Sequence, residues 1–229
     1  MSRFEKLLKR LGVKIQDKEY GDICSSRSVV KNRYINKDAN SGFYKVDIWT
    51  AAHKRLLPYL TKGLTLYYEI VGYLPGTSTC IQKNHDYGCK EGEFAIYIYR
   101  ITQTNADGVV YEFSAKQVQC WCKHYGLNSV PQLYYGRAVE LSKGTMEGNY
   151  GEWEEALLRA LKEDERDFNM EKPDPMCKNK VPFEGIVIRK ESIDLQVFKL
   201  KCDAHYQMET KNLDSGEIDI ETQETENNN

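Results

Sequence analysis

The sequence has no long hydrophobic run, and no stretch of about 18 apolar residues occurs that could cross a membrane as a helix. Its first residues, MSRFEKLLKRLG, also lack the apolar core of a secretory signal. A disulfide framework is not expected either, because the 7 cysteines are odd in number and scattered. These absences predict a cytoplasmic protein with reduced thiols and no membrane partner.

An excess of positive charge is missing as well, since 32 Lys and Arg residues stand against 34 Asp and Glu residues and leave a net charge of -2. A nucleic-acid partner would therefore have to be bound by a local basic patch. Tyrosine, in contrast, is abundant, with 16 tyrosines against 7 phenylalanines. Tyrosine suits half-buried strands and surfaces on which rings stack.

Strands and helices alternate along the chain, and hairpin turns are more frequent than the long crossovers of parallel sheets. Period-2 patterns predict strands at 64–72, 94–101, 109–113 and 130–135 and a hairpin at 183–201. Helical spacing predicts helices at 2–11, 46–60, 114–126 and 152–167, the third of which begins with a Ser114–Gln117 capping box. This order predicts an α+β fold of largely antiparallel sheets with flanking helices.

The chain is expected to form one domain over residues 1–207, followed by an acidic disordered tail over residues 208–229. Apolar residues become rare after Tyr206, and the last stretch, EIDIETQETENNN, is acidic and polar. Such a composition buries too little apolar surface to offset the entropy of ordering.

The hairpin at 183–201, FEGIVIRKESIDLQVFKLK, carries charges in a regular pattern. Glu184 precedes the first strand, and Lys199 and Lys201 lie two residues apart on the second strand, so they share one face. Two cations on one strand suit the phosphates of a nucleotide; alternatively, the lysines protect an edge strand from aggregation. Phe198 is expected on the opposite face, within a core.

Two further segments carry polar residues in apolar surroundings. Glu69 lies in the middle of the strand LTLYYEIVG, where a carboxylate is costly unless it is paired or hydrogen-bonded. It is therefore expected in a structural ion pair or in a polar cleft. In the Gly-rich loop 75–93, Cys80, His85 and Cys89 could bind a metal ion, but their spacing matches no common zinc motif and a fourth ligand is missing.

Five ordered segments resemble the nucleotidyltransferase motifs of ATP-dependent RNA ligases, especially the phage nick-sealing type. They are SSR at 25–27, YYEIVG at 67–72, IQKNHDYG at 81–88 followed by YIYRI at 97–101, EGIVIRK at 184–190 and FKLK at 198–201. The resemblance extends over residues 20–206. It implies the covalent nucleotidyltransferase fold, ATP (bound as AMP) and Mg²⁺ as cofactors, and RNA ends or a nicked duplex as partners.

The same resemblance implies a role for each of six side chains. Arg27 would contact the nucleotide and the RNA-side phosphate, Glu69 the ribose hydroxyls, and Tyr99 the adenine by stacking. Glu184 would be linked to the metal ion, and Lys199 and Lys201 would bind the α-phosphate and its neighbours.

The nucleophile of the family is a lysine in a Lys-x-Asp/His-Gly motif, which precedes the segment of Arg27, and no such motif occurs here. The nearest expected match is Lys9-Arg10-Leu11-Gly12, in which leucine takes the acidic or histidine position. We therefore expect that Met1 is not the true start and that an upstream segment or a second chain supplies the motif.

The expected function is that of an RNA ligase-type nucleotidyltransferase, which joins RNA 5′-phosphate to 3′-hydroxyl ends through adenylated intermediates. Without a motif lysine such a chain would not adenylate itself, although it could seal RNA that is already adenylated. Two alternatives remain open at this point. One is a non-catalytic nucleotide- or RNA-binding remnant or one part of a split ligase, and the other is a GTP-dependent capping-type transferase of the same fold.

Overall fold

The computed structural model describes residues 10–12, 21–26, 30–31, 47–137, 140, 172–192 and 194–215. The expected helix at 152–167, nearly all of that at 2–11, and Lys9 and Arg27 lie outside these residues. Most of the expected tail, residues 216–229, lies outside them as well. Within the described residues the protein is a mixed α and β structure with antiparallel sheets, as the sequence predicts.

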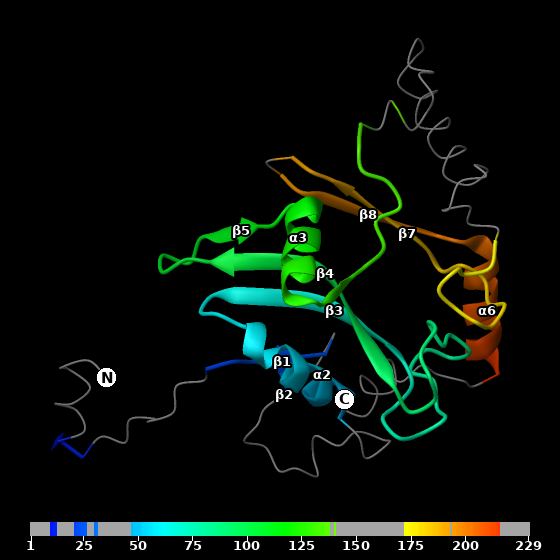
Figure 1. Ribbon diagram of the computed structural model, residues 1–229, viewed down its shortest axis with the longest axis horizontal. Helices are drawn as coiled ribbons and strands as arrows, with labels where there is room; N and C mark the ends of the chain where they lie inside the picture. Colours follow the sequence, from blue (N-terminus) through cyan, green and yellow to red (C-terminus); the bar gives the residue numbers. More distant parts are fainter. Residues whose placement is uncertain are drawn as a thin grey trace.

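The central sheet is built on two long antiparallel strands, β3 (Leu64–Gly72) and β4 (Phe94–Thr104) (Figure 1). The other edge of β4 pairs with β5 (Val110–Glu112) in antiparallel and with β6 (Asn128–Ser129) in parallel orientation. The predicted strand at 130–135 is wrong, because regular pairing ends with β6 and the chain from 130 to 137 is irregular.

A β-bulge at Tyr99 interrupts the pairing of β3 with β4. Tyr67 pairs with Arg100 and Tyr68 pairs with Ile98, so Tyr99 is an extra residue on β4. The bulge shifts the alternation of side chains by one residue, and Ile98 and Ile101 are therefore both fully buried in the core. A strict period of two along 94–101 would place Ile101 on the same side as Tyr99, and the bulge is the reason that it does not hold.

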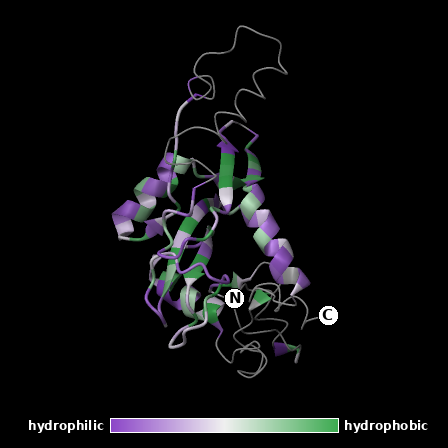
Figure 2. Cartoon of the chain, turned by 90° about the vertical axis from the view of Figure 1, so that its right-hand side faces the viewer, coloured by the Kyte–Doolittle hydropathy of each residue, from purple (hydrophilic) through white to green (hydrophobic). Residues whose placement is uncertain are grey.

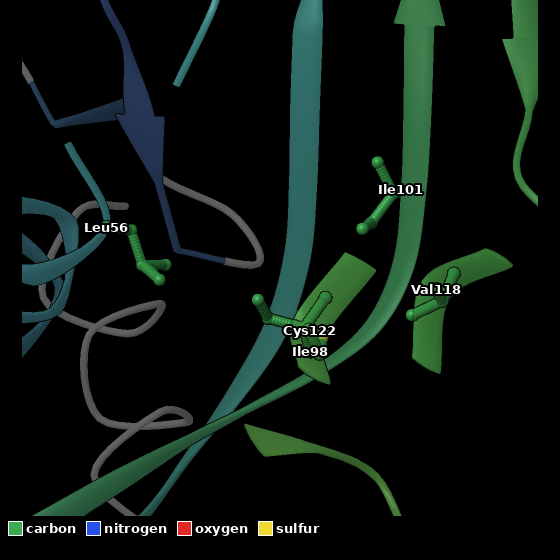
Figure 3. Packing of buried hydrophobic residues seen from close by; sticks show 5 residues of the cluster. All are labelled: Leu56, Ile98, Ile101, Val118 and Cys122. Atoms are coloured by element: carbon green, nitrogen blue, oxygen red, sulfur yellow. The ribbon is translucent and has the colours of Figure 1, made fainter. Parts of the chain in front are cut away.

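Helices α2 (Ile48–Leu56) and α3 (Ala115–Tyr125) pack on one face of this sheet. The predicted capping box is confirmed, since Ser114 and Gln117 each accept a hydrogen bond from the other's backbone amide, and α3 ends at Gly126 with φ 67°. Figure 3 shows the core between the layers, formed by Leu56 of α2, Ile98 and Ile101 of β4, and Val118 and Cys122 of α3. A short 3₁₀ turn, η1 (Leu57–Tyr59), follows α2.

A second, two-stranded sheet is the predicted hairpin of β7 (Gly185–Lys190) and β8 (Gln196–Lys201). Helix α6 (Asp203–Asp214) follows at once, and it continues past residue 207, where we expected the domain to end. In Figure 1, α6 lies on the same side of the molecule as the loops 75–93 and 172–182. Figure 2 shows that α6 is largely hydrophilic toward its C-terminal end.

A short hairpin of β1 (Cys24–Ser25) and β2 (Val30–Lys31) lies beside α2. It is tethered by Asp22, whose Oδ2 lies 2.5 Å from Nε2 of the buried His53 on α2. This histidine therefore packs against a partner within the fold. None of the helices in the described ranges has the length and apolar character needed to span a membrane.

Because Ile101 is fully buried between β4 and α3, Ile101→Ala removes apolar contacts and leaves a cavity. We expect the free energy of unfolding to fall by about 2–5 kcal/mol. Urea denaturation followed by circular dichroism measures this change. Val110→Ala is the matched control, since Val110 is 57% exposed and its truncation should change stability little. An equal loss of unfolding free energy in both variants would contradict the assignment of Ile101, and not Val110, to the core.

Candidate functional site

The face of the central sheet that turns away from α2 and α3 carries Tyr67 and Glu69 of β3. Cross-strand pairing places Tyr97 opposite Glu69 and Arg100 opposite Tyr67 on this same face. The ring of Tyr99 lies 6.3 Å from the ring of Tyr67, so the bulge turns Tyr99 toward it as well. Two of the predicted site residues, Glu69 and Tyr99, are therefore brought together.

Glu69 and Tyr99 are both exposed to solvent. The carboxylate of Glu69 is therefore not buried among apolar side chains, and the desolvation cost expected for such a position is avoided. An exposed ring and an exposed carboxylate on neighbouring strands can contact a flat heterocycle and a neighbouring polyol.

One face of the β7–β8 hairpin carries positively charged side chains. The register pairs Lys201 with Gly185, Lys199 with Val187 and Val197 with Arg189, so the two lysines share a face with Arg189. The side chain of Lys199 is exposed and makes no hydrogen bond or ion pair to any described residue. On the opposite face Phe198 is 57% exposed, so its predicted burial in a core is wrong for the part of the chain that the structure describes.

Glu112 of β5 joins the two faces. Its carboxylate accepts hydrogen bonds of 3.0 and 2.8 Å from Nε and Nη2 of Arg100, and Nη2 of Arg189 lies 3.6 Å from its Oε1. Arg189 also donates to the carbonyl oxygen of Phe113. The hydrogen bonds that Arg100 donates to Glu112 raise the pKa of Arg100 above its ordinary value. Arg189 therefore turns the lysine face of the hairpin toward the open face of the sheet.

Tyr87, in the loop 75–93, provides a second connection between the predicted site residues. Burial raises the pKa of its hydroxyl well above the ordinary value, and the negative charges of Glu184, Asp174 and Glu69 add to this effect. The protonated hydroxyl donates a 2.6 Å hydrogen bond to Oε1 of Gln82. The charges of Glu184 of the hairpin and Glu69 of the sheet thus both act on the hydroxyl of the same tyrosine.

The loop that holds Tyr87 is fixed by Asp86, which is only 3% exposed. Its carboxylate accepts hydrogen bonds from the backbone amides of Gly88 (2.6 Å), Lys178 (3.1 Å) and Asn179 (3.2 Å). Burial alone would raise the pKa of Asp86, but these three hydrogen bonds outweigh it and hold the pKa below the ordinary value. Tyr87 itself has φ 46°, an unfavourable conformation for a bulky residue, which this anchoring maintains.

Helix α6 contacts the site through Glu209 and His205. Glu209 Oε2 lies 2.7 Å from Nζ of Lys201, and the ring of the buried His205 lies edge-on to the ring of His85, with 5.6 Å between centroids. Burial would raise the pKa of Glu209, but the hydrogen bond and charge of Lys201 outweigh it and lower the pKa. Glu209 is therefore an ionised partner of one predicted phosphate ligand.

His85, which was a candidate metal ligand together with Cys80 and Cys89, lies instead in a buried and hydrogen-bonded position. His85 is fully buried, its Nδ1 donates a 2.8 Å hydrogen bond to the carbonyl oxygen of Lys83, and its ring stacks against Tyr87. In the ranges that the structure describes, no group of three or more His, Cys, Asp or Glu residues is arranged to hold a metal ion.

The sequence analysis missed Glu112, Asp86 and Glu209. Asp86 has a local signal, because an aspartate two residues before a glycine is typical of an Asx turn. Glu112 and Glu209 have none, since their partners lie on other elements and an isolated glutamate in a strand or helix is common. Arg27 lies outside the described residues, so its predicted role stays a prediction.

Asp86→Asn tests the anchoring of the loop. The amide oxygen can still accept two hydrogen bonds, but the NH₂ group would face the amide of Asn179, and the free energy of unfolding should fall by about 1–3 kcal/mol. Because the folded-state pKa of Asp86 is lowered, its stabilisation is present above the unfolded pKa of about 3.9 and is lost as the pH falls through the folded value. Urea denaturation at several pH values should therefore show the difference between the two proteins narrowing in acid. A difference that widened below pH of about 4 would contradict this assignment.

Comparison with known proteins identifies the family. The family model described as RNA ligase matches residues 14–201, which contain both faces of the site, the anchored loop and the hairpin. No curated protein and no solved structure matches the chain. A match over most of the 229 residues shows membership, and the chain belongs to the RNA ligase family.

Proposed function

We propose that the protein is an ATP-dependent RNA ligase that joins a 5′-phosphate to a 3′-hydroxyl through adenylated intermediates. The observation that carries the proposal is the pairing of two unlike faces through Glu112. One face offers a ring and a carboxylate, Tyr99 and Glu69, and the other offers the cations Lys199 and Lys201. Base, ribose and phosphates of one nucleotide require these three kinds of group.

The roles follow from the chemistry of each group. The π-face of Tyr99 stacks on adenine, and the carboxylate of Glu69 accepts hydrogen bonds from the ribose hydroxyls. Lys199 and Lys201 neutralise the α-phosphate and its neighbours, while Arg27 contacts the nucleotide and the RNA-side phosphate. Phosphoryl transfer is catalysed mainly by such positioning and charge neutralisation.

The carboxylates of the site fit a magnesium ion of the kind found with nucleotides. Mg²⁺ is usually bound through one or two carboxylates together with substrate phosphates and water. Glu184 is half-buried, and its charge, like those of Asp174 and Glu69, raises the pKa of the Tyr87 hydroxyl. Glu184 would hold the ion, which when bound neutralises charge on the phosphoryl oxygens.

The range matched by the family model contains a candidate nucleophile that departs from the strict motif at one position. The match begins at residue 14, and it includes Lys18-Glu19-Tyr20-Gly21. This sequence keeps the lysine and the glycine of the family motif and differs only in having tyrosine at the third position. It lies shortly before the segment of Arg27, which is where the family motif is expected. Lys9, in contrast, lies outside the matched range. We assign the nucleophile to Lys18.

In the reaction, Nζ of Lys18 attacks the α-phosphorus of ATP, and the bond to the β-phosphate oxygen breaks to release pyrophosphate. The RNA 5′-phosphate then takes the adenylyl group from the lysine. Finally the neighbouring 3′-hydroxyl attacks that phosphate, which forms the phosphodiester and releases AMP.

Lys18→Ala tests this assignment with α-labelled ATP and Mg²⁺. The wild type should form a covalent AMP adduct and Lys18→Ala should form none, because no other nucleophile replaces the lysine. Lys9→Ala is the matched control and should retain the adduct. Lys18→Ala should still seal a nick that carries pre-adenylated RNA, since that step needs the pocket but not the nucleophile.

The outcomes separate three possibilities. An adduct that persists in Lys18→Ala would refute the assignment of the nucleophile. A wild type that forms no adduct but seals pre-adenylated RNA would be a partial enzyme. A wild type that does neither would be a nucleotide- or RNA-binding protein.

The stacking role of Tyr99 predicts a difference between two substitutions. Tyr99→Ala should weaken ATP binding by about 1–3 kcal/mol, whereas Tyr99→Phe keeps the π-face and should bind nearly as the wild type does. Isothermal titration with ATP measures both affinities. An equal loss of ATP affinity in both variants would indicate that the hydroxyl of Tyr99, and not its ring, contacts the nucleotide.

A further inference from the structure

Helix α6 is joined to the phosphate-binding end of the hairpin by a single residue. Lys201 ends β8, α6 begins at Asp203, and the buried Cys202 between them donates a 2.9 Å hydrogen bond from its amide to the carbonyl oxygen of Glu184. The start of the helix is thus fixed to the residue that precedes β7. Any displacement of α6 would move Glu184 and Lys201 with it.

One face of α6 lies against the rest of the protein. His205 and Glu209 are four residues apart and so share this face, and His205 is 1% exposed whereas its neighbour Tyr206 is 63% exposed. The ring of His205 packs edge-on against His85, which belongs to the loop that Asp86 anchors. This packing holds α6 in one orientation and directs Glu209 toward Lys201.

The ion pair between Glu209 and Lys201 is close but only partly buried. The N–O distance is 2.7 Å, and the two side chains are 43% and 34% exposed for Lys201 and Glu209 respectively. Ion pairs this exposed contribute little to stability. Their larger consequence is conformational, because the four-carbon side chain of lysine is flexible and the carboxylate restricts it.

Glu209 does not use up the hydrogen-bonding capacity of Lys201. An ammonium group has three N–H donors, so one can bind Glu209 while two remain for phosphate oxygens. Lys199, on the same face of β8, has no such side-chain partner among the described residues. The two lysines therefore differ: Lys201 is held in advance, and Lys199 is free to follow the ligand.

We propose that Glu209 is a positioning residue, which acts through Lys201 to orient its ammonium group toward the phosphates of ATP. This inference rests on the proposed function, because it takes ATP as the ligand of Lys201. The opposite possibility is that Glu209 competes with the phosphates for Lys201 and must be displaced when ATP binds. The two ideas predict opposite changes in affinity when the carboxylate is removed.

The test is a double-mutant cycle on ATP binding in the presence of Mg²⁺, with Glu209→Ala, Lys201→Ala and the double variant of the full chain. We expect Glu209→Ala to raise the dissociation constant for ATP about threefold to tenfold, as the ammonium loses its orientation. In the Lys201→Ala background the same substitution should have no further effect, because the proposed influence of Glu209 on ATP passes through Lys201 and not through His205, whose Nε2 lies 3.6 Å from Glu209 Oε1. The dissociation constant of Glu209→Gln for ATP should lie between those of the wild type and Glu209→Ala, since the amide oxygen of glutamine still accepts a hydrogen bond.

Two controls distinguish positioning from a general structural effect. Asp214→Asn removes a carboxylate from an exposed position at the end of the same helix and should leave ATP affinity unchanged. Adenosine, which lacks phosphates, should bind the wild type and Glu209→Ala equally. A loss of adenosine affinity in Glu209→Ala would show that the substitution disturbs the whole site, and it would overturn the proposal.

The remaining outcomes also decide the matter. Unchanged ATP affinity in Glu209→Ala, tighter binding, or an equal loss in the Lys201→Ala background would each overturn the positioning role, and tighter binding would establish competition. Failure of the wild type to bind ATP would instead refute the proposed function, and this inference with it. The wild-type titration is therefore performed first.

Discussion

The carboxylate of Glu112 is the interaction on which the arrangement of the site depends. It binds Arg100 in the central sheet at 2.8 Å and lies 3.6 Å from Arg189 in the hairpin, although these residues are far apart in the sequence. Hydrogen bonds to charged groups are stronger than neutral ones, and a carboxylate can accept from two guanidinium groups at once. Neighbouring contacts support this bridge: Arg189 donates to the carbonyl oxygen of Phe113, and Glu191 accepts hydrogen bonds from the amide of Ala115 and the hydroxyl of Tyr135.

Away from Glu112, the loop 75–93 and helix α6 also hold the hairpin in place. Asp86 ties the loop to residues 178 and 179 through their backbone amides, and the His85–His205 contact ties the loop to α6. Because Lys201 and Glu184 adjoin α6 directly, the loop indirectly determines where the cations of β8 lie. The motif IQKNHDYG is thus mainly structural in its middle, with its buried aspartate and histidine acting as anchors.

The limits of sequence analysis are clearest at Tyr99. The pattern FAIYIYRI predicts a strand correctly, but a strict period of two assigns Ile101 to the wrong side. The bulge is invisible in the pattern, since it arises from the pairing of β4 with β3 and not from β4 itself. Similarly, Phe198 alternates like a core residue, yet no element of the described structure covers it.

The sequence alone determined the family, the main strands, the capped helix α3 and the shared face of the two lysines, because motifs, alternation and capping depend on residues close together in the chain. Alternation and spacing also placed Glu69, Tyr99 and the lysines on separate elements, and the family resemblance alone related them to one nucleotide. Only the tertiary structure decided how these elements lie relative to one another, through the contacts of Glu112 and Asp86 and the packing of α6. These contacts join residues that are distant in sequence, so their partners depend on how the sheets are stacked and leave no periodic or local signal.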